Sequence, residues 1–422
     1  MGEQAAPIVI VGAGHAGGAA AALLRQYGWR GPITLVGSEP APPYQRPPLS
    51  KAWLKGEADV ASLLLRPQAF YPANAIELVL SQRVTHIDRA ARRVVLQSGE
   101  CIRYERLILA LGSTVRTLDL PGIMLSGVLT LRDMAEAETL RTALRPGARL
   151  VVIGGGYIGL EVAASARALG ADVVVLEREE RLLARVAGPT LADFFRRQHA
   201  AHGVQVETGV RIEALEGVNG TVTGVRLADG RLFACDVVLI GIGASANDAL
   251  ARDAGLECDG GILVDSAART SDPAIHAIGD CTRRPVGAKR IRLESVPNAL
   301  EMAKQAAADI CGRAPPAAEV PWFWSDQYDI RLQIAGLSDG AAQAVTRGDP
   351  DTASFAIYHL AGDGTVLSVE AVNAPADFMA GKAMIARCRR VPAAALADPS
   401  RSLHELTRDI PPSPPLGAER VG

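Results

Sequence analysis

The chain has 422 residues, 48% of them hydrophobic and 42 of them glycine, so it is long enough for two or three domains with ample core. Its net charge of -2 at pH 7 argues against a general nucleic-acid-binding protein. The sequence shows neither the pattern of a signal peptide nor the roughly 20 consecutive apolar residues of a membrane span. We therefore expect a cytoplasmic protein with no membrane segment.

The first predicted element is a buried parallel strand at Ile8–Val11, which delivers the chain into the glycine-rich sequence GAGHAG at residues 12–17. A helix is expected from His15 to Tyr27. A second strand, Ile33–Val36, then leads to Glu39, about 20 residues beyond the last glycine, where a carboxylate can accept hydrogen bonds from ribose hydroxyls.

The same order of elements recurs 142 residues later. A strand at Leu150–Ile153 leads into GGGYIG at residues 154–159. We predict a helix at Tyr157–Leu169, a strand at Asp172–Leu176 and an acidic residue, Glu177, at the end of that strand.

In each copy the first glycine allows a tight turn, the second lets the backbone approach a pyrophosphate, and the third lets the helix pack on the strand. These are Gly12, Gly14 and Gly17 in the first copy and Gly154, Gly156 and Gly159 in the second. A lone glycine motif would be weak evidence, but strand, turn, helix, strand and acid in this order, twice, predict two bound dinucleotides.

The remaining elements suggest that the second unit is inserted in the first. Residues 107–110 and 237–240 read as strands, and Asp229-Gly230 is a hairpin signal. Beyond residue 243, strands near 262–264 and 277–278, followed by Gly279-Asp280 and a helix near 297–310, should return the chain to the first unit. Alternating segments at Phe355–Tyr358 and Val366–Val369 predict a smaller domain.

We therefore predict an α/β protein with two Rossmann-like dinucleotide-binding domains, the second inserted in the first, followed by a carboxy-terminal α+β domain. The expected limits are 1–113 with 244–319, 114–243, and 320–405, with a proline-rich disordered tail at 406–422.

The cysteines and histidines give no metal-site pattern. The six cysteines form no close pair, so neither a zinc ribbon nor a local disulfide framework is indicated. His199 and His202 lie on a predicted helix, and we interpret them as part of a solvated face rather than half of a metal site. The cysteines are Cys101, Cys235, Cys258, Cys281, Cys311 and Cys388.

Several motifs together resemble one family. The sequence GAGHAG with Glu39, PYQRPPLSK at 43–51, LALGS at 109–113, GGGYIGLE at 154–161, TSDPAIHAIGDC at 270–281, ESVPNA at 294–299 and PWFWSDQ at 321–327 resemble the ferredoxin reductases of bacterial oxygenase systems. The resemblance implies a flavoprotein on the glutathione reductase plan, with an FAD domain, an inserted NAD domain and a carboxy-terminal domain. Such a protein takes hydride from NADH and passes single electrons to a 2Fe-2S ferredoxin, as a monomer or weak homodimer.

The resemblance also implies roles for individual residues. Glu39 would hold the adenosine ribose of FAD, Asp280 the ribityl chain, and Arg46 and Arg132 would contact FAD. Lys51 would lie beside flavin N5 as a catalytic residue, paired with a second, Glu161. Further implied cofactor-binding positions, besides the motif glycines and Glu177, are His15, Ala16, Val84, Ala110, Tyr157, Ile158, Gly243, Val296 and Trp324.

Three of these assignments have plain structural alternatives. Asp280 could serve as a turn or helix-capping residue. Lys51 and Glu161 could be ordinary surface residues. Trp322 and Trp324 could cover the flavin edge or only pack in the core.

A carboxylate at Glu177 would favour NADH, because it accepts from free ribose hydroxyls and repels a 2′-phosphate. Arg178 and Arg181 could instead pair with such a phosphate if they turned inward.

With no cysteine before Cys101, reduced flavin would have no nearby thiol relay, and electrons should leave to an external acceptor. A basic set at Arg283, Arg284, Lys289, Arg290 and Arg292, with Arg387, Arg389 and Arg390, could steer an acidic ferredoxin or simply be solvated. Two other functions remain open: reduction of a quinone, monodehydroascorbate or dioxygen, and an NADH-sensing interaction role like that of apoptosis-inducing factor.

Overall fold

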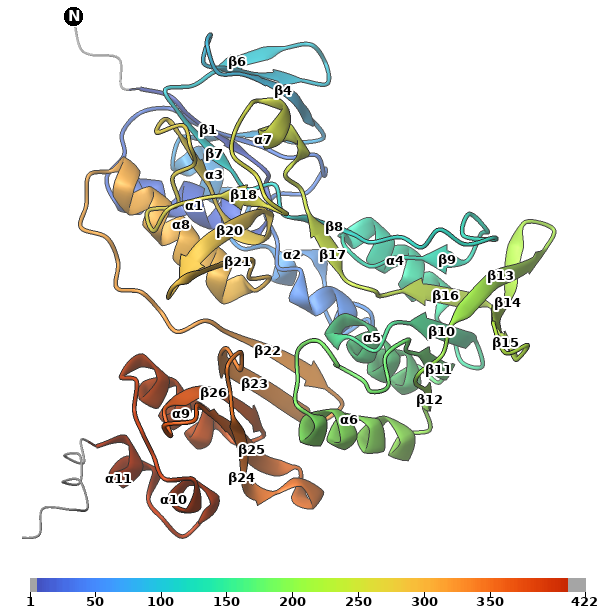
Figure 1. The fold of residues 1–422 in the computed structure, drawn as a ribbon. Coiled ribbons are helices and arrows are strands. Elements are labelled where there is room, and N and C mark those ends of the chain that lie inside the picture. The colour runs from blue at the N-terminus through green and yellow to red at the C-terminus, as the bar shows by residue number, and fades with distance from the viewer. Residues whose placement is uncertain (1–5, 409–422) are drawn as a thin grey trace, which may run out of the picture. The chain divides into compact units, whose positions relative to one another are not determined.

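The structure, a computed structural model, describes residues 6–408 (Figure 1). These residues fall into two compact units. The first contains the chain up to Ala318 together with Ser325–Asp329, and the second contains Glu319–Trp324 and the chain from Ile330 onward.

The amino-terminal part of the first unit is built on a parallel sheet of five strands. In spatial order these are β19 (Ile275–Ala277), β7 (Arg106–Leu109), β1 (Ile8–Val11), β2 (Ile33–Val36) and β3 (Ile76–Val79). Strand β19 follows the second glycine motif by more than a hundred residues yet pairs with β7, so the predicted return of the chain is confirmed. Helices α1 (His15–Gln26) and α8 (Val296–Ile310) pack against each other and into the same core.

A second parallel sheet of five strands carries the second glycine motif. Its order is β12 (Gln205–Glu207), β11 (Asp172–Leu176), β10 (Arg149–Ile153), β16 (Val237–Ile240) and β9 (Val128–Leu129). Helix α5 (Tyr157–Ala168) leaves the motif directly, and α6 (Pro189–Ala201) follows β11. Two Rossmann-like units, one inserted in the other, are therefore present as predicted.

Smaller sheets complete the first unit. The antiparallel sheet β13 (Ile212–Val218), β14 (Thr221–Leu227), β15 (Leu232–Ala234) contains the hairpin predicted at Asp229-Gly230. Chain segments entering and leaving the inserted unit pair as β8 (Ser113–Val115) and β17 (Ala244–Ala246). The others are β4 (Val84–Asp88), β5 (Arg93–Leu96), β6 (Cys101–Arg103), and β18 (Ile262–Leu263), β20 (Thr282–Val286), β21 (Lys289–Ile291). Short helices are η1 (Pro47–Ser50), α2 (Val60–Leu63), α3 (Phe70–Ala73), α4 (Met134–Ala143), α7 (Ala249–Asp253) and η2 (Gly279–Cys281).

The second unit is α+β, as expected. Its five-stranded sheet has the order β22 (Trp322–Gln327), β23 (Ile330–Gly336), β26 (Val366–Val372), β25 (Ser354–Leu360), β24 (Gln343–Asp349). Helix α9 (Pro375–Ala386) packs on this sheet, and η3 (Pro350–Thr352), α10 (Ala393–Ala397) and α11 (Leu403–Thr407) are short. The predicted tail, residues 406–422, begins within α11, and its residues after 408 lie outside the described part of the chain.

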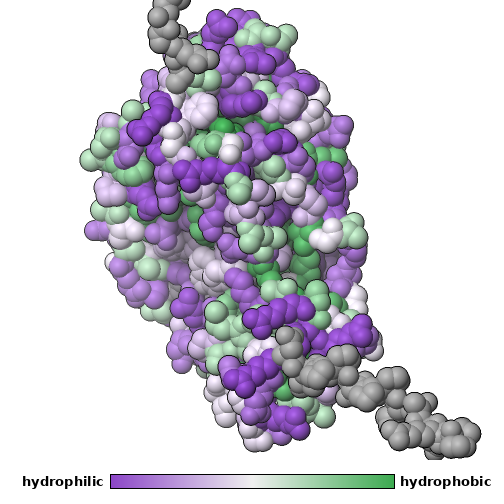
Figure 2. All heavy atoms as spheres, turned by 90° about the vertical axis from the view of Figure 1, so that its left-hand side faces the viewer, coloured by the Kyte–Doolittle hydropathy of each residue, from purple (hydrophilic) through white to green (hydrophobic). Residues whose placement is uncertain are grey.

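Charged and polar side chains are spread over the whole face shown in Figure 2, with apolar residues in small groups between them. Among residues 6–408, no helix has the length and apolar character needed to cross a membrane.

Candidate functional site

In the first glycine loop, the first and third glycines are closely packed and the second borders open space. A Cβ added at Gly17 would lie 1.9 Å from the carbonyl oxygen of Gly12, and one at Gly12 would lie 2.1 Å from that of Ala110. A Cβ at Gly14 would meet no described atom within 4 Å. Gly14 is also the N-cap of α1, and no side chain in the described part of the chain caps that helix. Uncapped N–H groups beside open space fit a phosphate group.

The predicted ribose acceptor, Glu39, lies just beyond β2 and has two partners. The Tyr44 hydroxyl donates to its Oε2 at 2.5 Å, and the Arg46 guanidinium forms an ion pair with its Oε1. Arg46 also donates from Nη1 to the carbonyl oxygen of Arg132 at 2.5 Å. The two predicted FAD-contacting arginines are therefore adjacent.

Asp280 joins this group from the turn after β19. Its Oδ2 lies 3.4 Å from Arg132 Nη2 and 3.3 Å from Ser113 Oγ. His15, on the first turn of α1, has a buried Nδ1 with no hydrogen-bond partner among the described residues. Burial lowers the His15 pKa, while Asp280 raises it and Arg46 lowers it through charge. An orphaned nitrogen among two arginines and two carboxylates fits a ligand rich in phosphates and hydroxyls, as FAD is.

The other predicted FAD positions are placed as follows. Ala110 donates its N–H to the Val11 carbonyl at 2.8 Å behind the loop, and Ala16 contacts Gly279. Val84 is buried in the core of the first sheet. Val296 begins α8, one residue before the predicted start.

The second glycine loop repeats the geometry of the first. A Cβ added at Gly154 would lie 2.5 Å from the carbonyl oxygen of Gly241, and one added at Gly159 would lie 2.4 Å from that of Gly154. A Cβ added at Gly156 would lie 3.9 Å from its nearest neighbour. Gly156 is the N-cap of α5, again without a side-chain cap from residues 6–408. In both motifs, therefore, only the second of the three glycines borders open space.

Around this second loop, Gly243 has a positive φ of 99°, and Arg185 lies near it. Tyr157 and Ile158 form the first turn of α5, and Ile158 is 47% exposed.

Glu177 lies at the end of β11 and contacts the second loop. Its Oε2 accepts from the Gly155 N–H at 2.6 Å and its Oε1 from the Glu179 N–H at 2.8 Å. The two arginines that left cofactor choice open are both engaged by protein groups. Arg178 pairs with Glu179 at 2.8 Å, and Arg181 donates to the carbonyl oxygens of Ala184 at 2.9 Å and Ala187 at 2.5 Å.

The predicted catalytic residues form an ion pair that joins the two nucleotide-binding parts of the first unit. Lys51 Nζ lies 2.6 Å from Glu161 Oε2, and the side chains are 17% and 3% exposed. The Ser50 hydroxyl donates to the same oxygen at 2.5 Å. Ser165, also on α5, donates to the Ser50 carbonyl at 2.7 Å and ties the segment ending in Lys51 to the helix. The surface-residue alternative is wrong for Glu161, which is buried, while Lys51 is partly buried by this contact.

Two neighbours of Glu161 were not predicted, Ser50 and Ser325. Ser325 donates from Oγ to Glu161 Oε1 at 2.7 Å. It lies in the PWFWSDQ segment, in which only the tryptophans suggest a functional role. Trp324 belongs to the second unit, where its ring lies 5.7 Å from that of Trp322, so its expected place near the flavin stays a prediction.

Two predictions about charged residues are wrong. His199 is fully buried rather than on a solvated face, because its Nε2 contacts Gln327 Oε1 at 2.8 Å and its Nδ1 contacts the Tyr328 hydroxyl at 3.0 Å. Arg284 cannot belong to an exposed basic patch, because it is buried and forms two 2.9 Å hydrogen bonds with Glu301.

The cysteines offer no thiol relay in the described chain. All six are free. Cys281, next to Asp280, is buried, and burial raises its pKa to about 12. A thiol with that pKa is neither a nucleophile nor a redox partner near neutral pH.

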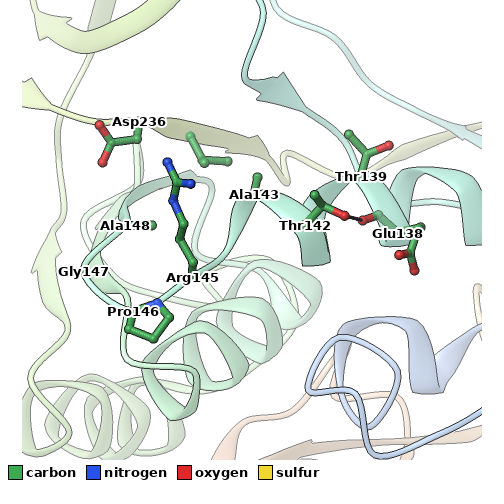
Figure 3. A pocket seen from close by; sticks show the side chains of 10 residues that line it. Glu138, Thr139, Thr142, Ala143, Arg145, Pro146, Gly147, Ala148 and Asp236 are labelled. Atoms are coloured by element: carbon green, nitrogen blue, oxygen red, sulfur yellow. Dashed lines mark hydrogen bonds between the residues drawn. The ribbon is translucent and has the colours of Figure 1, made fainter.

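A pocket of 680 Å³ lies away from this site (Figure 3). It is lined by the end of α4 and by Ala148 and Asp236, which precede β10 and β16. Ligands of parallel sheets bind at the carboxyl ends of the strands, and this pocket is at the opposite ends. We therefore place the candidate site at the glycine loops.

Comparison with known proteins identifies the family of the chain. Residues 6–303 match the family described as pyridine nucleotide-disulphide oxidoreductase, and residues 322–407 match a reductase C-terminal domain. A probable ferredoxin reductase, CtmF, of Castellaniella defragrans is 49% identical, with 93% of this chain and 96% of that protein covered. Putidaredoxin reductase CamA of Pseudomonas putida is 41% identical, with 94% and 96% covered.

Among solved structures, the covalent putidaredoxin reductase–putidaredoxin complex matches with a TM-score of 0.93 and 40% identity, covering 96% of this chain and 98% of that one. The family match over most of the chain and the identities of 40% or more establish the family of this protein. The chain belongs to the pyridine nucleotide-disulphide oxidoreductases, within their ferredoxin reductase group, and its cofactors are FAD and a nicotinamide dinucleotide.

Proposed function

We propose that this protein is an NADH-dependent reductase that passes single electrons to a 2Fe-2S ferredoxin, which in turn feeds a bacterial monooxygenase or dioxygenase. The observation that carries the proposal is the buried Lys51–Glu161 ion pair, which connects the first nucleotide-binding part to the second. Relatives named as ferredoxin reductases over almost the whole chain support the choice of acceptor.

In this proposal the first glycine loop binds FAD and the second binds NADH. FAD, when bound, accepts two electrons as hydride and can release them one at a time. Gly14 would leave room for the FAD pyrophosphate, Arg46 and Arg132 would neutralise its charge, and Asp280 would accept from a ribityl hydroxyl.

Glu161 orients the Lys51 ammonium through their ion pair at 2.6 Å. A cation held between the two loops favours negative charge arriving on the flavin ring. Because Glu161 is buried and Lys51 is partly buried, their charges are screened less than those of a surface pair.

We infer a preference for NADH over NADPH. Glu177 places a carboxylate where the ribose is expected, and a 2′-phosphate there would be repelled. The guanidinium groups of Arg178 and Arg181 are held by Glu179 and by backbone carbonyls, which supports the same preference.

An anaerobic titration tests the function. The purified yellow protein is reduced with one equivalent of NADH and mixed with candidate 2Fe-2S ferredoxins, and the ferredoxin spectrum is followed. We expect bleaching of the flavin band near 450 nm by NADH, then fast ferredoxin reduction. Fast turnover with a quinone or dioxygen but slow ferredoxin reduction would favour the other acceptors. A long-lived reduced complex that reduces no acceptor would favour a sensing role.

A further inference from the structure

A short segment of the chain belongs to the first unit although the residues on both sides belong to the second. Ser325–Asp329 groups with the nucleotide-binding parts, whereas Glu319–Trp324 and the chain from Ile330 do not. Ser325 is fully buried and Gln327 is 1% exposed. Two polar side chains at full burial need hydrogen-bond partners, and these partners lie on the second nucleotide-binding part.

The partners form a continuous chain that ends on Glu161. The Tyr328 hydroxyl is 3.0 Å from His199 Nδ1, and His199 Nε2 is 2.8 Å from Gln327 Oε1. Gln327 Nε2 donates to Ser325 Oγ at 3.2 Å, and Ser325 Oγ donates to Glu161 Oε1 at 2.7 Å. Glu161 Oε2 is the oxygen bound to Lys51.

The carboxylate fixes the direction of every hydrogen bond in this chain. An ionised carboxylate only accepts, so the Ser325 hydroxyl must donate to Glu161 and can accept only from the Gln327 amide nitrogen. Gln327 Oε1 then has to accept from His199, which requires hydrogen on Nε2; in the neutral ring this leaves Nδ1 without hydrogen. His199 Nδ1 is left as an acceptor for the Tyr328 hydroxyl. All four donors therefore point toward Glu161.

The surroundings of His199 favour this neutral form. Burial is the largest cause and lowers the pKa of His199 to about 4, and the nearby charge of His202 acts in the same direction. His202 stacks on the Tyr328 ring at 3.7 Å, and Arg167 is the other charged group near that phenol. Among residues 6–408, no carboxylate raises the pKa of this imidazole, so the ring stays a donor through Nε2 alone near neutral pH.

We propose that Ser325, Gln327 and His199 are positioning residues for hydride transfer, which act through Glu161 to hold the Lys51 ammonium in place. The inference rests on the proposed function, in which Lys51 lies between the two cofactors. The Ser325 hydroxyl is the direct contact, Gln327 orients that hydroxyl, and His199 orients Gln327.

Removal of the hydroxyl has a defined consequence. Without Ser325 Oγ, Glu161 Oε1 loses its donor while Oε2 keeps two, so the carboxylate is free to turn and carry the ammonium with it. Small displacements of a positioned charge lower the rate of a chemical step by about ten- to a hundredfold. The contacts of the glycine loops with their cofactors are unchanged, so binding should not suffer.

Stopped-flow reduction of the FAD-loaded protein by NADH gives the first test. We expect Ser325→Ala and Gln327→Leu to lower the limiting rate of flavin reduction by about tenfold, with less than about a twofold change in the NADH dissociation constant. Ser325→Thr, which keeps the hydroxyl, should restore most of the rate. Ser368→Ala is the control, because Ser368 is a buried hydroxyl with no hydrogen-bond partner among the described residues, and it should leave the rate unchanged.

The outcomes separate the two levels of proposal. Wild-type protein that NADH fails to reduce would refute the proposed function itself. Wild-type protein that is reduced, with Ser325→Ala and Gln327→Leu reduced at the same rate, would refute only the positioning role. A loss shared by Ser325→Thr and Ser368→Ala would show a general packing effect and would also overturn it.

A second test needs no turnover. In protein carrying ¹⁵N-histidine, with the His199 signal assigned from its absence in His199→Gln, we expect Nε2 protonated and Nδ1 unprotonated at pH 7. Ser325→Ala should shift the His199 signals, because the two residues share Gln327. A ring protonated on Nδ1, or signals that do not respond to Ser325→Ala, would contradict the directional chain.

Discussion

In the first glycine loop, one added methyl group should have different effects at Gly17, where it should lower stability, and at Gly14, where it should prevent FAD binding. At Gly17 the new Cβ would lie 1.9 Å from the backbone oxygen of Gly12, about 1.5 Å short of ordinary contact. Backbone cannot yield as a flexible side chain does, so Gly17→Ala should lower the unfolding free energy of the apoprotein by about 3 kcal/mol or more. At Gly14 the Cβ meets no described atom within 4 Å, and its φ of -82° suits any residue.

Gly14→Ala should therefore fold normally, with an unfolding free energy within about 1 kcal/mol of wild type, since the poorer N-cap is offset in part by the lower conformational entropy of the unfolded alanine variant. It should lose FAD, because the methyl group fills the space that the pyrophosphate needs. The second loop supplies the matched control. Gly156→Ala, with 3.9 Å of clearance, should stay yellow but be reduced poorly by NADH.

Urea unfolding of the apoproteins and the flavin absorbance of the purified variants measure both effects. A Gly14→Ala protein that binds FAD as tightly as wild type would refute the assignment of the first loop. A Gly156→Ala protein that loses FAD instead of NADH would reverse the two loops. Gly17→Ala with unchanged stability would mean that the loop can open, contrary to the packing described.

Three further changes test other parts of the structure. Arg284→Ala should destabilise the protein by about 3–5 kcal/mol in urea unfolding, because the buried carboxylate of Glu301 loses both hydrogen bonds from its guanidinium partner, whereas Arg283→Ala, whose partner Asp259 is exposed, should cost below about 1 kcal/mol. Because the pKa of His199 is lowered to about 4, the unfolded chain takes up a proton between pH 6.5 and 4 that the folded chain does not. Acidification across that window should therefore remove up to about 3 kcal/mol of stability from wild type relative to His199→Gln. An equal pH dependence of the unfolding free energy in the two proteins would contradict this. Glu177→Ala should raise the KM for NADH about tenfold and reduce the preference for NADH over NADPH in steady-state assays. An unchanged ratio of the kcat/KM values for NADH and NADPH would show that Glu177 does not contact the ribose.

The features that sequence predicted well are set by neighbours along the chain. Strands β1, β2, β11 and β16 have the predicted bounds, because a short apolar run between turn residues leaves few choices for a buried parallel strand. The glycine loops follow directly, since the first and third glycines of each motif are required by close backbone contacts, while the second borders open space. The Lys51–Glu161 pair came from resemblance to known reductases, as nothing local links residues 110 positions apart.

The error at Arg284 could have been avoided. Arg283 and Arg284 are consecutive in strand β20, and consecutive side chains of a strand point to opposite faces. Only one of them could face solvent with the basic set. The partner of the other, Glu301, lies on helix α8, whose pairing with β20 requires the tertiary fold.

The error at His199 and the omission of Ser325 have different causes. His199 lies four residues after Phe195 and eight after Leu191, so the period of helix α6 already places it on the buried face. Serine and glutamine are too common in strands to signal a site, and the burial of Ser325 and Gln327 depends on contacts with residues 164 and 128 positions away. Sequence periodicity reports the face on which a residue lies and not what covers that face. The carboxylate of Glu161 is thus held from both sides, by Lys51 and Ser50 at one oxygen and by Ser325 at the other, and the two serine contacts required the folded chain to be seen.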